Sequence, residues 1–207
     1  GALADQNLTT ASASHNTAVG YNAGGAITTA IRTTILGALA SDAATTGERN
    51  VALGYAALSA DTKGNRSVSI GYEALGTQNF TTSTDNYNVG IGYLAGNVIS
   101  TGVQNTLVGG LSGDVLTDAD DNVAMGYASL SSDTLGSKST ALGRSALANQ
   151  NFTTATNSHN TAVGFQAGIN VTTGVQNTLL GSSTASTLTS GSNNIIIGYF
   201  SNVSAAG

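Results

Sequence analysis

One glycine returns along this chain at an almost constant interval, and this spacing constrains the fold more than any other feature. The recurring positions are Gly20, Gly37, Gly54, Gly71, Gly92, Gly109, Gly126, Gly143, Gly164, Gly181 and Gly198. Eight of the ten intervals are identical, and the two from Gly71 to Gly92 and from Gly143 to Gly164 are each longer by four positions. A period of about 17 residues indicates a stack of similar short units, because the common helical repeats need about 33 residues or more.

A longer period lies on top of the first. Three regular intervals and one lengthened interval form a superrepeat of about 72 residues, which is the next level of internal repetition. The segment TGVQNTLVG at 101–109 returns as TGVQNTLLG at 173–181, and QNFTT at 78–82 returns at 150–154. We therefore interpret residues 1–207 as a single repeat domain and predict no boundary within it.

The residues before each glycine have the character of short β-strands. Examples are NVALG at 50–54 and NIIIG at 194–198, which are apolar or β-branched runs closed by glycine. In six coils a second glycine lies seven positions earlier, at Gly47, Gly64, Gly102, Gly136, Gly174 and Gly191. A glycine at a fixed place predicts a turn with positive φ or a close backbone approach. The sequence thus predicts an all-β protein, a parallel β-roll or β-solenoid of about eleven coils.

Two apolar columns run along these strands. The residue just before the glycine is aliphatic in every coil, as in Val19, Leu36 and Met125, and we expect it to fill the coil interior. The preceding residue should then point outward, although it is apolar in nine of eleven coils. An outward apolar column needs a covering surface, which predicts a homo-oligomer. The large members of that column are expected to line the oligomer axis: Ile35, Leu107, Leu179 and Ile196.

Composition excludes several functional classes. Only 8% of the residues are charged, and Lys and Arg together number six. These are too few to form a basic face, so we expect no nucleic-acid partner. There is no cysteine and no apolar run long enough for a membrane helix, so we expect no disulfide, thiolate metal site or membrane insertion. The acidic cluster Asp118, Asp120 and Asp121 offers oxygen ligands of the kind that calcium prefers, but it does not recur in other coils. We expect no catalytic residues, no metal and no cofactor.

The strand segments resemble a known repeat. SVSIG at 67–71, NVALG at 50–54 and NVGIG at 88–92 are similar to the head repeat of YadA-type trimeric autotransporter adhesins, Asn-Ser-Val-Ala-Ile-Gly. NTAVGY at 16–21 is similar to repeats with a following aromatic residue in bacteriophage tail fibres. The resemblance implies a left-handed parallel β-roll with three chains around one axis. It also implies a host-attachment fibre, outside the cell on a virion or a cell surface.

Three groups of side chains invite a functional interpretation. An aromatic residue follows most of the glycines, at Tyr21, Tyr55, Tyr72, Tyr93, Tyr127, Phe165 and Tyr199. These rings could bind carbohydrate, but their strict register favours a structural stack between coils. Arginine recurs at one position on three consecutive coils, as Arg32, Arg49 and Arg66. The row could bind an anion, but we favour a surface row that pairs with acids such as Glu48 and Asp61. His15 and His159 have no partner histidine and are interpreted as polar surface residues.

The two four-residue insertions are the strongest candidates for binding. They fall within 78–86 and 150–158. Insertions in solenoids collect on one face, which is often the binding face. Phe80, Asp85, Phe152 and Asn157 are therefore predicted contacts for a glycan or protein receptor on a cell surface. The alternative is that these loops cap a groove or touch a neighbouring chain.

Three functions compete at this point. The leading hypothesis is a segment of a phage tail fibre or surface adhesin that forms a homotrimer and mediates host attachment. The second is a self-assembling extracellular filament or coat protein without a receptor, because open strand edges invite end-to-end stacking. The third is an ice- or surface-binding solenoid, which would need a flat exposed array of threonines. We expect the threonines to be scattered or inward, which disfavours this third function.

Overall fold

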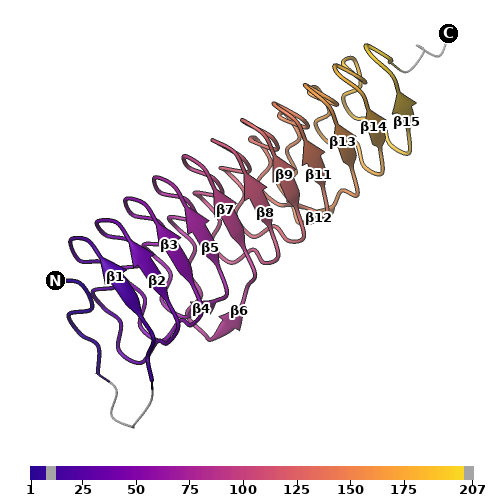
Figure 1. Cartoon of the computed structure of the whole chain (residues 1–207). Coiled ribbons are helices and arrows are strands. Elements are labelled where there is room, and N and C mark those ends of the chain that lie inside the picture. Colours follow the sequence, from indigo (N-terminus) through magenta and orange to yellow (C-terminus); the bar gives the residue numbers. More distant parts are fainter. Residues whose placement is uncertain (8–12, 203–207) are drawn as a thin grey trace.

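The computed structural model describes residues 1–7 and 13–202, and in it the chain is a parallel β-solenoid of about eleven coils. Figure 1 shows the coils stacked one on another in chain order, so that the two ends of the described chain lie at opposite ends of the stack. Each coil adds one strand of three residues to a single large sheet. The predicted fold class is confirmed.

The large sheet follows the order of the chain. Its eleven strands are β1 (Thr17–Val19), β2 (Thr34–Leu36), β3 (Val51–Leu53), β5 (Val68–Ile70), β7 (Val89–Ile91), β8 (Thr106–Val108), β9 (Val123–Met125), β11 (Thr140–Leu142), β13 (Thr161–Val163), β14 (Thr178–Leu180) and β15 (Ile195–Ile197). All neighbouring strands pair in parallel, and each residue pairs with the residue at the equivalent position of the next coil, as Leu107 does with Ala124. Equivalent residues of successive coils therefore form straight columns along the stack.

Each of the two longer coils has one extra strand outside this sheet, which pairs with a short strand of the coil before it. β4 (Gly64–Asn65) pairs with β6 (Thr84–Asp85), and β10 (Gly136–Ser137) pairs with β12 (Thr156–Asn157). In Figure 1 the pair β4 and β6 lies away from the row of large-sheet arrows. The inserted residues are thus accommodated on another side of the solenoid, and the register of the large sheet continues without a break.

The recurring glycine is required for two reasons. Gly109 has φ +136°, a conformation that other residues rarely adopt. A Cβ atom there would also lie 2.5 Å from the carbonyl oxygen of Gly126 in the next coil. The second glycine serves the close approach alone, since a Cβ at Gly102 would lie 2.3 Å from the Ala119 oxygen.

A ladder of buried asparagines joins the coils from within. These residues, four positions before the glycine, form what we call the asparagine ladder. The backbone N–H of Asn105 donates to Oδ1 of Asn88 at 2.9 Å, and that of Asn122 donates to Oδ1 of Asn105 at 3.0 Å. Asn105 Nδ2 donates to the Ala119 carbonyl at 2.7 Å. Each buried side-chain amide therefore satisfies two backbone groups of the following coil, and the backbone N–H of the same residue bonds to the amide of the preceding coil.

The ladder decides which strand residues face the core, and it reverses our expectation. Because the asparagine points inward, alternation turns the residue two positions later inward as well. The residues predicted to line an axis between chains lie inside a single chain, three at 0% exposure and the last at 6%: Ile35, Leu107, Leu179 and Ile196. The column predicted to be interior is on the surface, with Val19 at 58% and Ile197 at 62% exposure. A shift of one residue exchanges the faces, and hydrophobicity alone did not distinguish two apolar columns.

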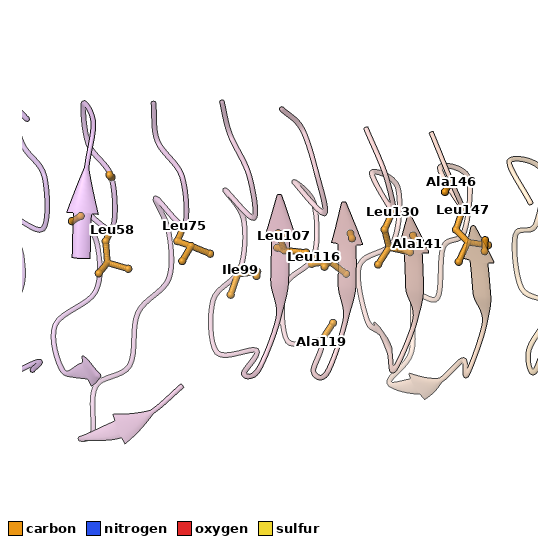
Figure 2. Close-up of a cluster of buried hydrophobic side chains, with 14 of the residues drawn as sticks. Leu58, Leu75, Ile99, Leu107, Leu116, Ala119, Leu130, Ala141, Ala146 and Leu147 are labelled. Atoms are coloured by element: carbon orange, nitrogen blue, oxygen red, sulfur yellow. The ribbon is translucent and has the colours of Figure 1, made fainter. Parts of the chain in front are cut away.

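The core is narrow and is filled by pairing large residues with small ones. A Cβ at Gly96 would lie 2.7 Å from Cδ1 of Leu107, and one at Gly113 would lie 2.8 Å from its Cδ2. A Cβ at Gly90 would lie 2.7 Å from Cγ of Leu75. Figure 2 shows these aliphatic side chains, including Leu75 and Leu107, gathered inside the coils. These glycines therefore leave the space that Leu75 and Leu107 fill.

Replacing Gly109 with alanine should destabilise the stack severely. The added Cβ meets the backbone of the next coil in a strained conformation, so we expect a loss of more than about 3 kcal/mol in the free energy of unfolding. The matched control is Gly110→Ala, where the nearest atom to the new Cβ is 3.6 Å away. That variant should stay within about 0.5 kcal/mol of wild type. Urea unfolding of both variants tests this, and equal midpoints would contradict it.

Candidate interaction surface

The outer face of the large sheet carries two columns of side chains along the whole stack. The residues one before the glycine form the outer aliphatic column: Val19, Leu36, Leu53, Ile70, Ile91, Val108, Met125, Leu142, Val163, Leu180 and Ile197. The residues three before it form the outer threonine–valine column: Thr17, Thr34, Val51, Val68, Val89, Thr106, Val123, Thr140, Thr161, Thr178 and Ile195. With strands about 4.8 Å apart, this face is about 48 Å long. It contains no charged residue.

Several of these side chains are far more exposed than aliphatic residues usually are. Leu36 is 50% exposed, and Met125 and Leu180 are each 45% exposed. Six other members of the column are partly buried. Isolated exposed aliphatics are ordinary, but an apolar column that continues along a whole face marks an interaction surface. The asparagine ladder shares a face with the residue two positions later, so the inward direction of the asparagines leaves this column outside.

The threonines require a second correction. We expected them to be scattered or inward, yet in six coils a threonine occupies the outward-facing column. Thr17, Thr34 and Thr178 are exposed, and Thr106, Thr140 and Thr161 are partly exposed. The same reversal of faces explains this error. The other five coils carry valine or isoleucine there, so the column is not a continuous threonine array.

An aromatic ridge borders this face at the residue after the glycine. Tyr55 and Tyr72 stack with centroids 5.3 Å apart, and Tyr72 and Tyr93 with centroids 5.5 Å apart. Arg144 takes the ridge position between Tyr127 and Phe165, with its guanidinium 5.9 Å and 5.6 Å from their ring centroids. The stacked tyrosines are neighbours along the stack, so their faces cover one another. The arrangement supports the structural interpretation of the aromatic residues.

The arginine row is largely neutralised within the chain. Arg49 forms an ion pair with Glu48 at 2.8 Å, and Arg66 pairs with Asp85. The Arg66 guanidinium also lies 5.5 Å from the ring centroid of Tyr87. These contacts favour the paired surface row over an anion site. Asp61 was expected among the acidic partners but is buried in a different network.

Of the four receptor contacts predicted in the two insertion loops, the structure buries two and exposes two. Phe80 and Phe152 are each only 6% exposed, so their rings anchor the loops and cannot be receptor contacts as predicted. The phenyl groups turn inward because they are the largest apolar side chains in otherwise polar loops. Asp85 and Asn157 are exposed at equivalent places and stay predicted contacts.

A buried polar network supports each insertion, and our sequence reasoning missed it. Asp61 Oδ1 accepts the backbone N–H groups of Gly64 at 2.9 Å and Phe80 at 3.0 Å. Gln78 Nε2 donates to Asp61 Oδ2 at 2.5 Å and to Ser67 Oγ at 2.9 Å. Gln78 Oε1 accepts from Asn88 Nδ2 at 2.9 Å. The glutamine thus carries the asparagine ladder across the longer coil, where serine replaces asparagine.

The same network recurs one superrepeat later. Gln150 Nε2 donates to Asp133 Oδ2 at 2.5 Å, and Gln150 Oε1 accepts from Asn160 Nδ2 at 2.8 Å. The signal that could have revealed it is the identical spacing of Asp61 from Gln78 and of Asp133 from Gln150, one regular coil in both copies. A polar pair at a column that is otherwise aliphatic indicates a satisfied internal network.

Other candidate sites are limited. Within residues 1–7 and 13–202, no three His, Cys, Asp or Glu residues lie close enough to hold a metal ion. The same ranges contain no helix long and apolar enough to span a membrane. His15 and His159 are exposed. One shallow hollow of about 170 Å³ is lined by Ala56, Ser59, Glu73, Gly76, Thr77 and Asn97.

Comparison with models of protein families, with curated proteins and with solved structures finds no match to this chain. The class that the fold defines is a parallel β-solenoid of about eleven turns.

The buried carboxyl of Asp61 should make stability depend on pH. Burial raises its pKa above the ordinary 3.8, although hydrogen bonds from Gln78, Phe80 and Gly64 act in the opposite direction. Since the folded-state pKa exceeds that of the unfolded chain, the stabilising contribution is complete below 3.8. It is lost as the pH rises through the folded-state pKa.

The variant Asp61→Asn should remove this pH dependence, because asparagine does not titrate. It should also lower the free energy of unfolding by an amount that does not depend on pH, because the new amide nitrogen would face the Nε2 donor of Gln78. We expect the wild-type protein to exceed the variant in free energy of unfolding by the largest amount at acidic pH, and we expect this difference to fall as the pH rises. Urea unfolding across a pH series measures this difference. Asp118→Asn, at an exposed carboxylate, is the control. A difference that grows with pH would contradict the prediction.

Proposed function

We propose that this chain is a rigid, non-enzymatic segment of an extracellular attachment fibre, assembled from copies of itself. The observation that supports this most is the outer aliphatic column, which continues across all eleven strands of the large sheet. In the assembly this face and the aromatic ridge pack against the same surfaces of other copies.

The energetics favour such packing. Full burial of a leucine or isoleucine side chain contributes roughly 1.5–3 kcal/mol, and the half-exposed members of this column would gain about half of that. Because the column repeats at every coil, small gains add along the stack. The two outer columns carry no charge that would have to be desolvated, and on the ridge the Arg144 guanidinium lies against the rings of Tyr127 and Phe165.

The number of copies and the hand of the coil come from the resemblance to YadA-type head repeats. SVSIG at 67–71 and NVGIG at 88–92 are the segments most similar to that repeat. By this resemblance the assembly is a left-handed roll of three chains. The axis contacts are now assigned to the outer aliphatic column instead of the buried one.

Attachment follows from the shape and symmetry of such a fibre. A stack stabilised at every coil is a stiff spacer, and three chains present each surface loop three times. Multivalent contacts of this kind turn weak single-site binding into stable adhesion. Asp85 and Asn157 lie on extra strands outside the large sheet, where they stay accessible for a glycan or protein receptor.

The other two functions are less well supported. An end-to-end filament would use the open edges of β1 and β15 and leaves the outer aliphatic column uncovered. An ice-binding face gains from the outward threonines, but valine and isoleucine interrupt their column. The aromatic ridge along the border also differs from a flat threonine array.

Charges placed on the outer aliphatic column should separate the chains without unfolding them. The test variant is Leu36→Asp with Leu180→Asp, at residues that are 50% and 45% exposed. We expect wild type to have the mass of a trimer by light scattering, and the double variant that of a monomer with unchanged β circular dichroism. The control is Val98→Asp, which is 39% exposed but outside the large sheet, and it should remain trimeric.

Two further measurements complete this test. Leu107→Asp should unfold the chain, because that side chain is fully buried within it. On a glycan array, the assembled protein should bind at least about tenfold more strongly than the monomeric variant, through multivalency. A monomeric wild type, or a trimeric double variant, would show that this face is not the interface.

A further inference from the structure

The insertion loops share a sequence triplet that the proposed fibre function does not explain. Asn79-Phe80-Thr81 recurs as Asn151-Phe152-Thr153 at the equivalent place in the next superrepeat. The pattern Asn-x-Ser/Thr, with x other than proline, is the acceptor sequence for N-linked glycans when it lies on an accessible surface. Further triplets begin at Asn7 and at Asn202, and in both the next two residues lie outside the described part of the chain.

The structure presents both triplets outward. Asn79 and Thr81 are exposed, whereas Phe80 between them is buried. The same alternation holds for Asn151, Phe152 and Thr153. The buried ring therefore anchors the segment and places the amide and the threonine hydroxyl on the same outer surface.

The amide nitrogens are free to react. Asn79 Oδ1 accepts from Thr62 Oγ1 at 3.1 Å, and Asn151 Oδ1 accepts from Thr134 Oγ1 at 3.3 Å. Neither Nδ2 atom donates a hydrogen bond to any residue in the described part of the chain. Each side chain is thus held by its oxygen with its nitrogen toward solvent.

Ordinary coils use this position differently. There it is threonine or serine, and its hydroxyl donates to a carbonyl of the next coil, as Thr45 does to Thr62 at 3.1 Å and Thr117 to Thr134 at 3.0 Å. The longer coils replace that internal contact with an outward amide. The exchange occurs where a threonine two positions later completes the triplet.

The two other triplets that lie wholly in the described part of the chain lack this geometry. Asn65-Arg66-Ser67 matches the pattern, but Asn65 is 7% exposed and Ser67 is fully buried. Asn65 Nδ2 donates to Ser83 Oγ at 3.1 Å and to Asp85 Oδ1 at 3.2 Å. In Asn170-Val171-Thr172 the Asn170 Nδ2 donates to the Ser186 carbonyl at 2.7 Å. The pattern alone therefore does not distinguish the insertion loops; the accessible, unbonded amide does.

We propose that Asn79 and Asn151 are acceptor sites for N-linked glycans. In the transfer, Nδ2 attacks the anomeric carbon of a sugar carried on a lipid pyrophosphate. The new N–C bond forms as the bond from that carbon to the pyrophosphate oxygen breaks. The lipid pyrophosphate leaves, and one amide proton passes to a base of the transferase.

The glycans would lie about 19 Å apart along the stack, since the two sites are four coils apart. Both lie in the longer coils and not on the large sheet, so they leave the outer aliphatic column free for packing between chains. The inference rests on the extracellular location in the proposed function, because transfer takes place on chains that enter a secretory route.

The test uses the full chain, secreted from cultured animal cells together with a glycoprotein of known occupancy. Enzymatic release of the glycans in heavy-oxygen water, followed by mass spectrometry of peptides, marks each occupied asparagine. We expect marks at Asn79 and Asn151 and none at Asn65. Thr81→Ala should abolish the first mark and Thr153→Ala the second. The matched controls Thr82→Ala and Thr154→Ala alter adjacent exposed threonines and should keep both marks.

Bare Asn79 and Asn151 in the secreted protein, with the companion glycoprotein modified, would overturn the inference. Occupancy of Asn65 in protein with wild-type circular dichroism would also overturn it, because accessibility would then not select the sites. Light scattering on the same samples separates the two proposals. A trimer with bare amides refutes only the glycan sites, and a glycosylated monomer refutes only the assembly.

Discussion

Each coil of this protein is held mainly by hydrogen bonds to the coils above and below it, and not by contacts within itself. The parallel strands, the Gly109–Gly126 approach and the asparagine ladder all act along the stack. Close stacking requires that equivalent residues repeat at every level. This requirement explains why the glycine is present in all eleven coils and why the ladder position carries asparagine in eight of them and serine or threonine in the other three.

The same stacking leaves little room for a core. A coil of about 17 residues encloses only a few side chains, and a large one such as Leu107 fits only because Gly96 and Gly113 lie against it. The outer aliphatic column cannot fit inside and is left on the surface. A chain built in this way has an unsatisfied apolar face as a direct consequence of its narrowness. Association with other copies is the simplest way to cover that face.

The longer coils show how the repeat tolerates an irregularity. Inside, Gln78 restores the ladder where Ser67 interrupts it, and Asp61 holds the backbone of the inserted segment. On the outside, the extra residues form exposed segments that include the short strands β6 and β12. An insertion that is fixed internally in this way can vary its outer residues for recognition or modification without disturbing the large sheet.

The spacing of the glycines was sufficient to predict the parallel solenoid, its eleven coils and the turn at Gly109, because a strict period admits few other folds. Sequence also located the insertions, but it misassigned Phe80 and Phe152, whose burial depends on the rest of the coil. It could not decide whether Leu107 or Val108 faces inward, since both columns are apolar and alternation only relates one residue to the next. The tertiary structure decided this through Asn105: its buried side-chain amide bonds to the backbone of the following coil, and this fixes the direction of every side chain on the strand.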